Sequence, residues 1–100
     1  MTEILAHADN DHYSITASNH AGSHDACVMV SAIMYALAGA IKTNPQVDVL
    51  GVQLHDGYAK IEYLSKHRTG EEDFRMAVVG LMQVELAYPD DIIVHQNIIF

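Results

Sequence analysis

Apolar and polar residues alternate in the first part of the chain, the pattern typical of half-buried β-strands. The alternation covers Glu3–Ala8 and Tyr13–Ala17 on either side of a polar turn, and it predicts a β-hairpin. A nearly unbroken apolar stretch then predicts a helix over Asp25–Lys42, with Asp25 as its N-cap and Asn44-Pro45 as its stop. We expect this helix to be the most buried element of the fold.

A second hairpin is predicted in the middle of the chain. Two apolar stretches, Val47–Leu54 and Tyr58–Leu64, flank Asp56-Gly57. This dipeptide favours a primed turn with positive φ at both residues. The apolar phase changes at Gly51, which indicates a β-bulge in the first of the two strands.

The last part of the chain predicts a helix and a strand. Thr69–Glu72 fits a capping box, and apolar residues then recur at helical spacing until Pro89. A final strand over Ile92–Phe100 ends in an apolar tail that the sheet, a second subunit or a partner would cover. The order ββαββαβ predicts an α+β fold, a two-layer sandwich of two helices on a mainly antiparallel sheet. We expect a single domain over residues 1–100.

The charge balance limits the partners of the protein. Its 13 acidic and 5 basic residues give a net charge of −8, which repels phosphate backbones and argues against direct binding of nucleic acid. A basic peptide or protein suits this field, and solubility alone explains an acidic surface equally well.

Cysteine usage and hydropathy predict a cytoplasmic protein that does not insert into membranes. One cysteine permits no intramolecular disulfide and no cysteine-rich zinc site, which fits a reducing compartment. Residues 1–7 lack the basic stretch and apolar core of a secretory signal. The longest uncharged stretch, Ala26–Ile41, is shorter than the roughly 18 residues that a membrane span needs.

The single cysteine, Cys27, lies where the first helix is expected to begin. The positive end of a helix dipole stabilises a thiolate, and a neighbouring histidine can activate the sulfur as a nucleophile. His20 and His24 both lie close to Cys27 in sequence, and spacing does not choose between them as the base. The competing interpretation is that Cys27 fills the core as a small apolar residue.

Two further roles follow from the position of this segment. Asp25 can orient a histidine or cap the helix. If the thiolate attacks a peptide carbonyl, the backbone N–H groups of Cys27 and Val28 are the expected donors to the developing oxyanion.

A metal site is another interpretation of the histidines. His20 and His24 have the spacing of zinc-binding helices, and His7, Asp9 and His12 form a second loose cluster. The first pair lies in a Gly/Ser-containing loop rather than a helix, however, and the second cluster crosses a turn. No glycine-rich phosphate loop is present. We therefore expect neither a metal nor another cofactor.

The residues around Cys27 follow a recognisable order: His20-Ala21, a short loop with Gly and Ser, Asp25, Cys27, and then Ser31-Ala32 in the apolar helix. This order resembles the ribosomal-processing cysteine protease family, Prp. In that family a Gly-His-Ala motif ends a strand, and an Asp-x-x-Cys-x-x-x-Ser-Ala motif begins the first helix.

Weaker similarity to the same family extends along nearly the whole chain. Asp56–Glu62 is similar to the central Asp-Gly-Tyr hairpin of the family, and Glu85–Asp90 resembles the close of its second helix. The order of secondary-structure elements also agrees.

The resemblance implies a cysteine endopeptidase in which Cys27 is the nucleophile, His20 is its base and Ser31 lies near the site. Members of the family remove a short N-terminal extension from the twenty-seventh protein of the large ribosomal subunit, a step in ribosome biogenesis. The resemblance therefore implies a peptide substrate, with a basic ribosomal-protein N-terminus as the partner. It also implies a cytoplasmic homodimer.

Three positions depart from the family pattern. Asn19 replaces the glycine before the histidine, a change that asparagine tolerates because it accepts left-handed backbone angles. Alignment on Cys27 places His24 where the family has its aspartate, because Asp25 is one residue too close. The loop between His20 and Cys27 is also several residues shorter than in the family.

Two other functions compete with the protease. The short loop is compatible with a catalytically silent binding module that holds a ribosomal protein or another partner. A structural dimer formed through Ile98–Phe100 would instead leave Cys27 buried and unreactive.

Overall fold

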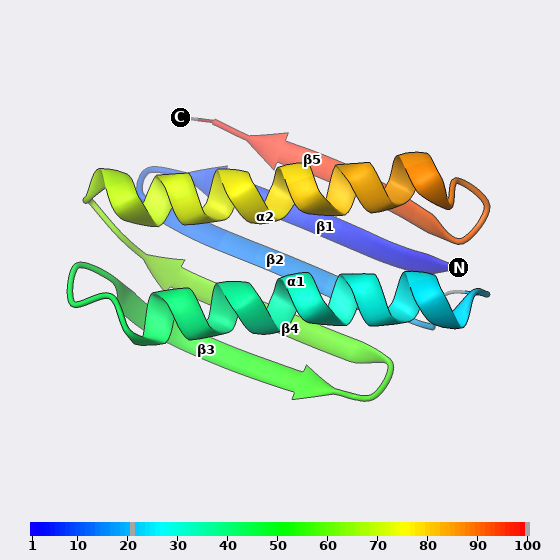
Figure 1. Cartoon of the computed structure of the whole chain (residues 1–100). Helices are drawn as coiled ribbons and strands as arrows, with labels where there is room; N and C mark the ends of the chain where they lie inside the picture. The colour runs from blue at the N-terminus through cyan, green and yellow to red at the C-terminus, as the bar shows by residue number, and fades with distance from the viewer. Residues whose placement is uncertain (21, 100) are drawn as a thin grey trace.

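The computed structural model describes residues 1–20 and 22–99. Along the chain it forms β1 (Thr2–Asp9), β2 (His12–Ser18), α1 (His24–Lys42), β3 (Asp48–His55), β4 (Tyr58–Leu64), α2 (Arg68–Ala87) and β5 (Ile92–Ile98) (Figure 1). The predicted order ββαββαβ is confirmed, and the element boundaries differ from the predicted ones by at most two residues.

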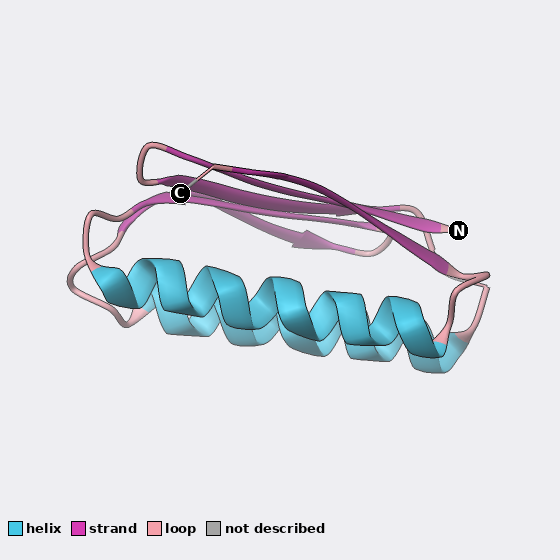
Figure 2. Cartoon of the chain, turned by 90° about the horizontal axis from the view of Figure 1, so that it is seen from above, coloured by secondary structure: helices cyan, strands magenta, loops and turns pink. Residues whose placement is uncertain are grey.

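The elements form two layers. Helices α1 and α2 lie side by side and run in opposite directions across one face of the sheet (Figures 1 and 2). The strands are ordered β3-β4-β2-β1-β5. β1 pairs with β5 in parallel, and the other neighbouring strands pair antiparallel. The predicted α+β sandwich on a mainly antiparallel sheet is therefore confirmed.

The two hairpin turns differ from each other in backbone conformation. Asn10 and Asp11 both have positive φ, 50° and 67°, as a primed turn between β1 and β2 requires. In the β3–β4 turn only Gly57 has positive φ, 79°. The prediction of positive φ at both Asp56 and Gly57 was therefore wrong, because only the residue without a Cβ takes the left-handed conformation here. The bulge predicted at Gly51 is confirmed by a register shift in the β3–β4 ladder.

The beginnings of both helices correct the predicted caps. Ser23, and not Asp25, is the N-cap of α1, and its side chain accepts a hydrogen bond from the Ala26 N–H at 3.4 Å. Ser23 precedes Ala26 by three positions, the usual sequence spacing between an N-cap side chain and the N–H that it bonds, so Asp25 falls inside the first turn. In α2 the His67 ring accepts from the Thr69 N–H, and Thr69 is a helical residue instead of the predicted cap.

Helix α1 is less buried than its apolar sequence predicts. Its inward face packs into the core, but Val28, Met29 and Tyr35 on its outer face are exposed. The sheet covers only one side of the helical layer, so an apolar helix keeps one side in solvent. The prediction that α1 is the most buried element was therefore wrong. By length and mean hydropathy alone α1 could cross a membrane, a test that the core helix of a soluble protein also passes.

The core lies between the helices and the inward face of the sheet. Alternate residues of β1 and β2 point inward, and α2 contributes the predicted stripe that includes Phe74, Val78 and Leu81. Tyr13 stacks on Tyr63 with 5.1 Å between ring centroids. The Tyr63 hydroxyl is buried and donates to the Gly70 carbonyl at 2.7 Å. Burial, and secondarily the charge of Asp73, raise the pKa of Tyr63 far above its ordinary value.

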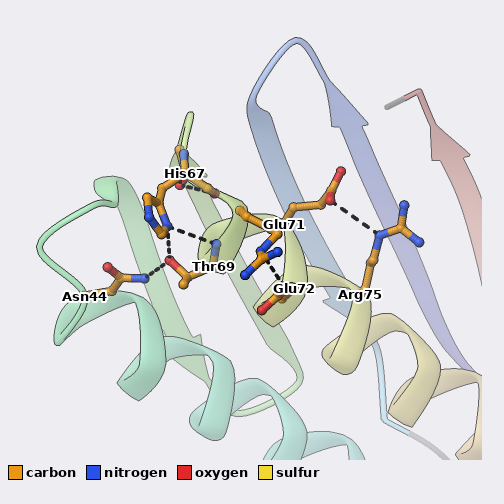
Figure 3. Close-up of polar contacts among 8 residues, drawn as sticks. Asn44, His67, Thr69, Glu71, Glu72 and Arg75 are labelled. Atoms are coloured by element: carbon orange, nitrogen blue, oxygen red, sulfur yellow. Dashed lines mark hydrogen bonds and ion pairs between the residues drawn. The ribbon is translucent and has the colours of Figure 1, made fainter.

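Polar side chains join the loops at the end of the molecule where α1 stops and α2 starts (Figure 3). Asn44 donates to the Thr69 hydroxyl at 2.8 Å, and His67 Nδ1 lies 2.9 Å from the same oxygen. The Ser65 hydroxyl lies 3.2 Å from the carbonyl oxygens of Gln46 and His67. The loops before β3 and before α2 are thereby held together, far from Cys27 along the helical layer.

The C-terminal strand ends earlier than predicted. β5 stops at Ile98, and Ile99 is exposed while its N–H donates to the Ala8 carbonyl at 2.8 Å. Phe100, the last residue of the predicted apolar tail, lies outside the described residues.

Candidate active site

The end of β2 places His20 beside the β3–β4 turn. Asn19 has a φ of 71°, the left-handed conformation expected of it from the sequence. Its N–H donates to the Gly57 carbonyl at 2.9 Å, and its carbonyl accepts from the Thr2 hydroxyl at 2.9 Å. The backbone that carries His20 is therefore fixed to two other parts of the sheet, while the imidazole is 62% exposed.

Cys27 lies in the first turn of α1 and is partly buried. Its N–H donates to the Ser23 carbonyl at 3.2 Å, which is the first hydrogen bond of the helix. This N–H is therefore engaged, and the prediction that it serves as an oxyanion donor was wrong. The groups that lack a carbonyl partner within a helix are those before the first bond, here the N–H groups of His24 and Asp25.

Two adjoining hollows bring the predicted residues together. A cavity of about 360 Å³ lies between α1 and the β3–β4 hairpin, and a wider depression of about 700 Å³ opens beside it. Cys27, His20 and Ser31 line both hollows. His24 lines only the wider depression, and Asp25 lines neither and is exposed.

The walls of the cavity suit a polypeptide. The apolar residues that line it come from both layers: Ala17, Val30, Met34, Leu54 and Ala59. Tyr35 and Tyr58 add aromatic side chains that are partly in solvent. A cavity lined by apolar side chains together with polar groups is the usual form of a site that binds an organic substrate.

Asp56 belongs to the site, although sequence reasoning assigned it only to a turn. It lines both hollows, and its Oδ1 lies 3.7 Å from Nε2 of His20. The carboxylate side chain is 97% exposed. The signal that could have found it is the Asp-Gly-Tyr hairpin motif of the resembling family, since a turn beside the active-site cleft brings its polar residue to the cavity.

The histidines do not form a metal centre in the described residues, where no group of three His, Cys, Asp or Glu side chains is placed to hold a metal ion. His12 Nε2 lies 2.6 Å from Glu62 Oε2, and the His7 ring packs edge-on against His12 with centroids 6.0 Å apart. His12 therefore takes part in a cross-strand pair between β2 and β4.

Comparison with solved structures finds proteins of the same fold, whereas comparison with known sequences finds no match. No protein-family model and no curated protein sequence matches the chain. The ribosomal processing protease Prp of S. aureus, solved with a covalently linked product peptide, matches 97% of this chain and 100% of its own at a TM-score of 0.82 and 16% identity. The chain has the Prp fold. A Streptococcus mutans protein matches with the same TM-score at 18% identity, with 99% of each chain covered.

The resemblance to Prp inferred from the residues around Cys27 is thus confirmed for the fold. A second S. aureus Prp structure, in complex with a substrate peptide, matches 97% of this chain and 100% of its own at a TM-score of 0.75 and 17% identity. At such identities the likeness carries no residue roles with it, so the assignments of Cys27 and His20 remain predictions.

Proposed function

We propose that the protein is a cysteine peptidase that processes a ribosomal protein. The observation that carries this proposal is that Cys27 and His20 line the same cavity. The solved proteases of this fold hold a product peptide or a substrate peptide. Cysteine with histidine is the pairing that activates a sulfur nucleophile near neutral pH.

The mechanism is acyl transfer. Cys27 Sγ attacks the scissile carbonyl, and His20 takes up the thiol proton and then donates it to the leaving amine. A water molecule, activated by the same imidazole, releases the acyl group from sulfur. The N–H group of His24 at the start of α1 stabilises the developing oxyanion. Ser31, one turn after Cys27, lines the site beside the nucleophile.

The substrate that fits best is the N-terminal extension of the twenty-seventh protein of the large ribosomal subunit. Ribosomal-protein tails are basic, and a net charge of −8 favours their encounter with this surface. The apolar walls around Met34 and Leu54 accept side chains near the cut. Because this attraction acts between exposed charges, we expect cleavage to slow as salt is added.

We further propose a cytoplasmic homodimer. Its support is the uncovered apolar side chains of the helical layer, including Tyr35, Met76, Val79 and Leu86. Sedimentation analysis should then give twice the chain mass of 11.0 kDa. A monomer at all concentrations would contradict the homodimer and leave the peptidase proposal unaffected.

The test uses a synthetic peptide that spans the N-terminal extension of this ribosomal protein. Wild type should release one product by mass spectrometry, and Cys27→Ala should release none. His20→Ala should slow cleavage by about 10²–10⁴-fold, the usual contribution of a general acid–base group. His95→Ala removes an exposed histidine from β5, far from the cavity, and should leave the rate unchanged.

The same experiment separates a peptidase from a binding module. Equal binding of the peptide by wild type and Cys27→Ala, without product from either, would contradict the peptidase and favour the silent relative. Cleavage that survives Cys27→Ala would contradict the assignment of the nucleophile.

A further inference from the structure

Three contacts join His20 and its neighbour Asn19 to the β3–β4 turn. The Asn19 N–H donates to the Gly57 carbonyl at 2.9 Å. A Cβ at position 57 would lie 3.1 Å from Nε2 of His20, so the imidazole rests against the backbone of the turn. Asp56 Oδ1 lies 3.7 Å from the same nitrogen. The imidazole therefore packs against the backbone of the turn, and the Asp56 carboxylate lies near Nε2 of the ring.

The approach of Asp56 to Nε2 has a consequence for the other nitrogen. A neutral imidazole carries its proton on one nitrogen and a lone pair on the other, and the partner of the first nitrogen decides which is which. A carboxylate that accepts from Nε2–H leaves the lone pair on Nδ1. Such a ring can take a thiol proton at Nδ1, and the Asp56 carboxylate then faces the imidazolium that results.

We propose that Asp56 is a positioning residue that holds His20 in the Nε2–H tautomer, so that Nδ1 faces the thiol of Cys27. The proposal rests on the proposed function and names the third member of its site. The separation of 3.7 Å is that of an ion pair, and the nearly fully exposed Asp56 side chain can rotate to shorten it when a substrate is bound.

The surroundings of His20 and His24 indicate which of the two histidines is the base. His24 is the exposed first residue of α1 and lines only the wider depression. Among the described residues no carboxylate is paired with it. His20 has a carboxylate, a backbone support and a place on both hollows, so it is the histidine equipped to act on Cys27.

Thiol reactivity tests the proposal without knowledge of the substrate, because the sign of the effect is diagnostic. A carboxylate whose negative charge acted directly on the Cys27 sulfur would disfavour the thiolate, so Asp56→Ala would speed alkylation of Cys27. A carboxylate that positions His20 favours transfer of the thiol proton to the ring, so the same variant would slow alkylation.

The experiment is a double-mutant cycle on the rate of alkylation by iodoacetamide at neutral pH. Asp56→Ala should slow the reaction about three- to fivefold, the size expected for an exposed ion pair. In the His20→Ala background the same change should have no effect, because Asp56 acts through that ring. Asp56→Glu should restore most of the rate. Asp48→Ala, which removes an exposed carboxylate at the other end of β3, should match wild type.

Imidazole ¹⁵N shifts supply an independent readout for a variant that disturbs the turn. Asp56→Asn keeps a residue suited to turns, and the His20 signals should move toward the tautomer mixture of free imidazole. Faster alkylation in Asp56→Ala, an equal effect in both backgrounds, or unchanged ¹⁵N shifts would each overturn the proposal. Normal coupling with no peptide cleavage would contradict the peptidase alone.

Discussion

The two ends of the helical layer use polar residues in opposite ways. Where α1 stops and α2 starts, the side chains of Asn44, Ser65 and Thr69 are bonded to groups in neighbouring loops (Figure 3). Where α1 starts, His20 and Asp56 are largely exposed and border a cavity. At the first end the polar side chains join the loops by hydrogen bonds, and at the second end they remain accessible to solvent.

Two histidines make this contrast concrete. His67 caps α2, with its ring nitrogen accepting from the Thr69 N–H at 3.2 Å. His20 caps nothing and faces the cavity with Asp56 and Cys27. Because residue type is the same, the surroundings decide whether an imidazole stabilises a helix or is available for chemistry. The contrast predicts that changes at the first end alter stability and changes at the second alter reactivity.

The largest effect on stability is expected from Gly70→Ala. A Cβ there would lie 2.3 Å from the side chain of Ser65, which is buried, so the helix start must shift. We expect a loss of about 2–3 kcal/mol in urea unfolding, typical of overpacking. Gly39→Ala is the matched control, because nothing lies within 4 Å of its added Cβ and a helix gains about 0.5–1 kcal/mol from this change. Equal stabilities of the two variants would contradict the close packing of Gly70 against Ser65.

Tyr63→Phe should have the next largest effect. It removes the buried hydroxyl that donates to the Gly70 carbonyl, at a cost of about 1–2 kcal/mol. Cys27 alkylation should stay at the wild-type rate, because Tyr63 lies outside both hollows. A change in that rate would show that the two ends are coupled. Tyr35→Phe, at an exposed position, serves as the stability control.

Alkaline pH should weaken the same end. Burial raises the pKa of Tyr63 above the value of about 10 that the residue has in an unfolded chain. The resulting stability is complete below about pH 10 and is lost as the pH rises, since only the unfolded chain then releases the phenolic proton. Urea midpoints above pH 10 should therefore fall more steeply in wild type than in Tyr63→Phe. Parallel curves would argue that Tyr63 does not titrate with unfolding.

The smallest stability effects come from exchanging the two histidines for alanine. His67→Ala removes an N-cap and should cost about 1 kcal/mol. His20→Ala removes an exposed side chain and should change stability by less than about 0.5 kcal/mol. Alkylation of Cys27 should respond in the reverse order, slow in His20→Ala and normal in His67→Ala. If stability and alkylation rate ranked the two variants in the same order, the contrast between the two ends would be contradicted.

Local patterns predicted the elements well because each depends on a few neighbouring residues. Alternation located β1 and β2, the Asp56-Gly57 dipeptide located the turn between β3 and β4, and Pro89 marked the end of α2. The N-caps were harder to predict from the sequence. Ser23 and His67 cap their helices through hydrogen bonds that depend on how the preceding loop enters the helix. The exposure of the outer face of α1 was not predicted for a related reason, because an apolar sequence does not show how many layers of structure will cover it.

The sequence by itself determined which groups are capable of chemistry here: a lone cysteine near a helix start and two histidines upstream. Only the tertiary structure decided which of them meet. Pairing of β2 with β4 brings the turn of a distant hairpin against His20, and Asp56 enters the site although it lies 36 positions after that histidine. Sequence spacing constrains contacts within one helix or hairpin, whereas contacts between hairpins depend on strand order and register, which the whole hydrophobic core selects.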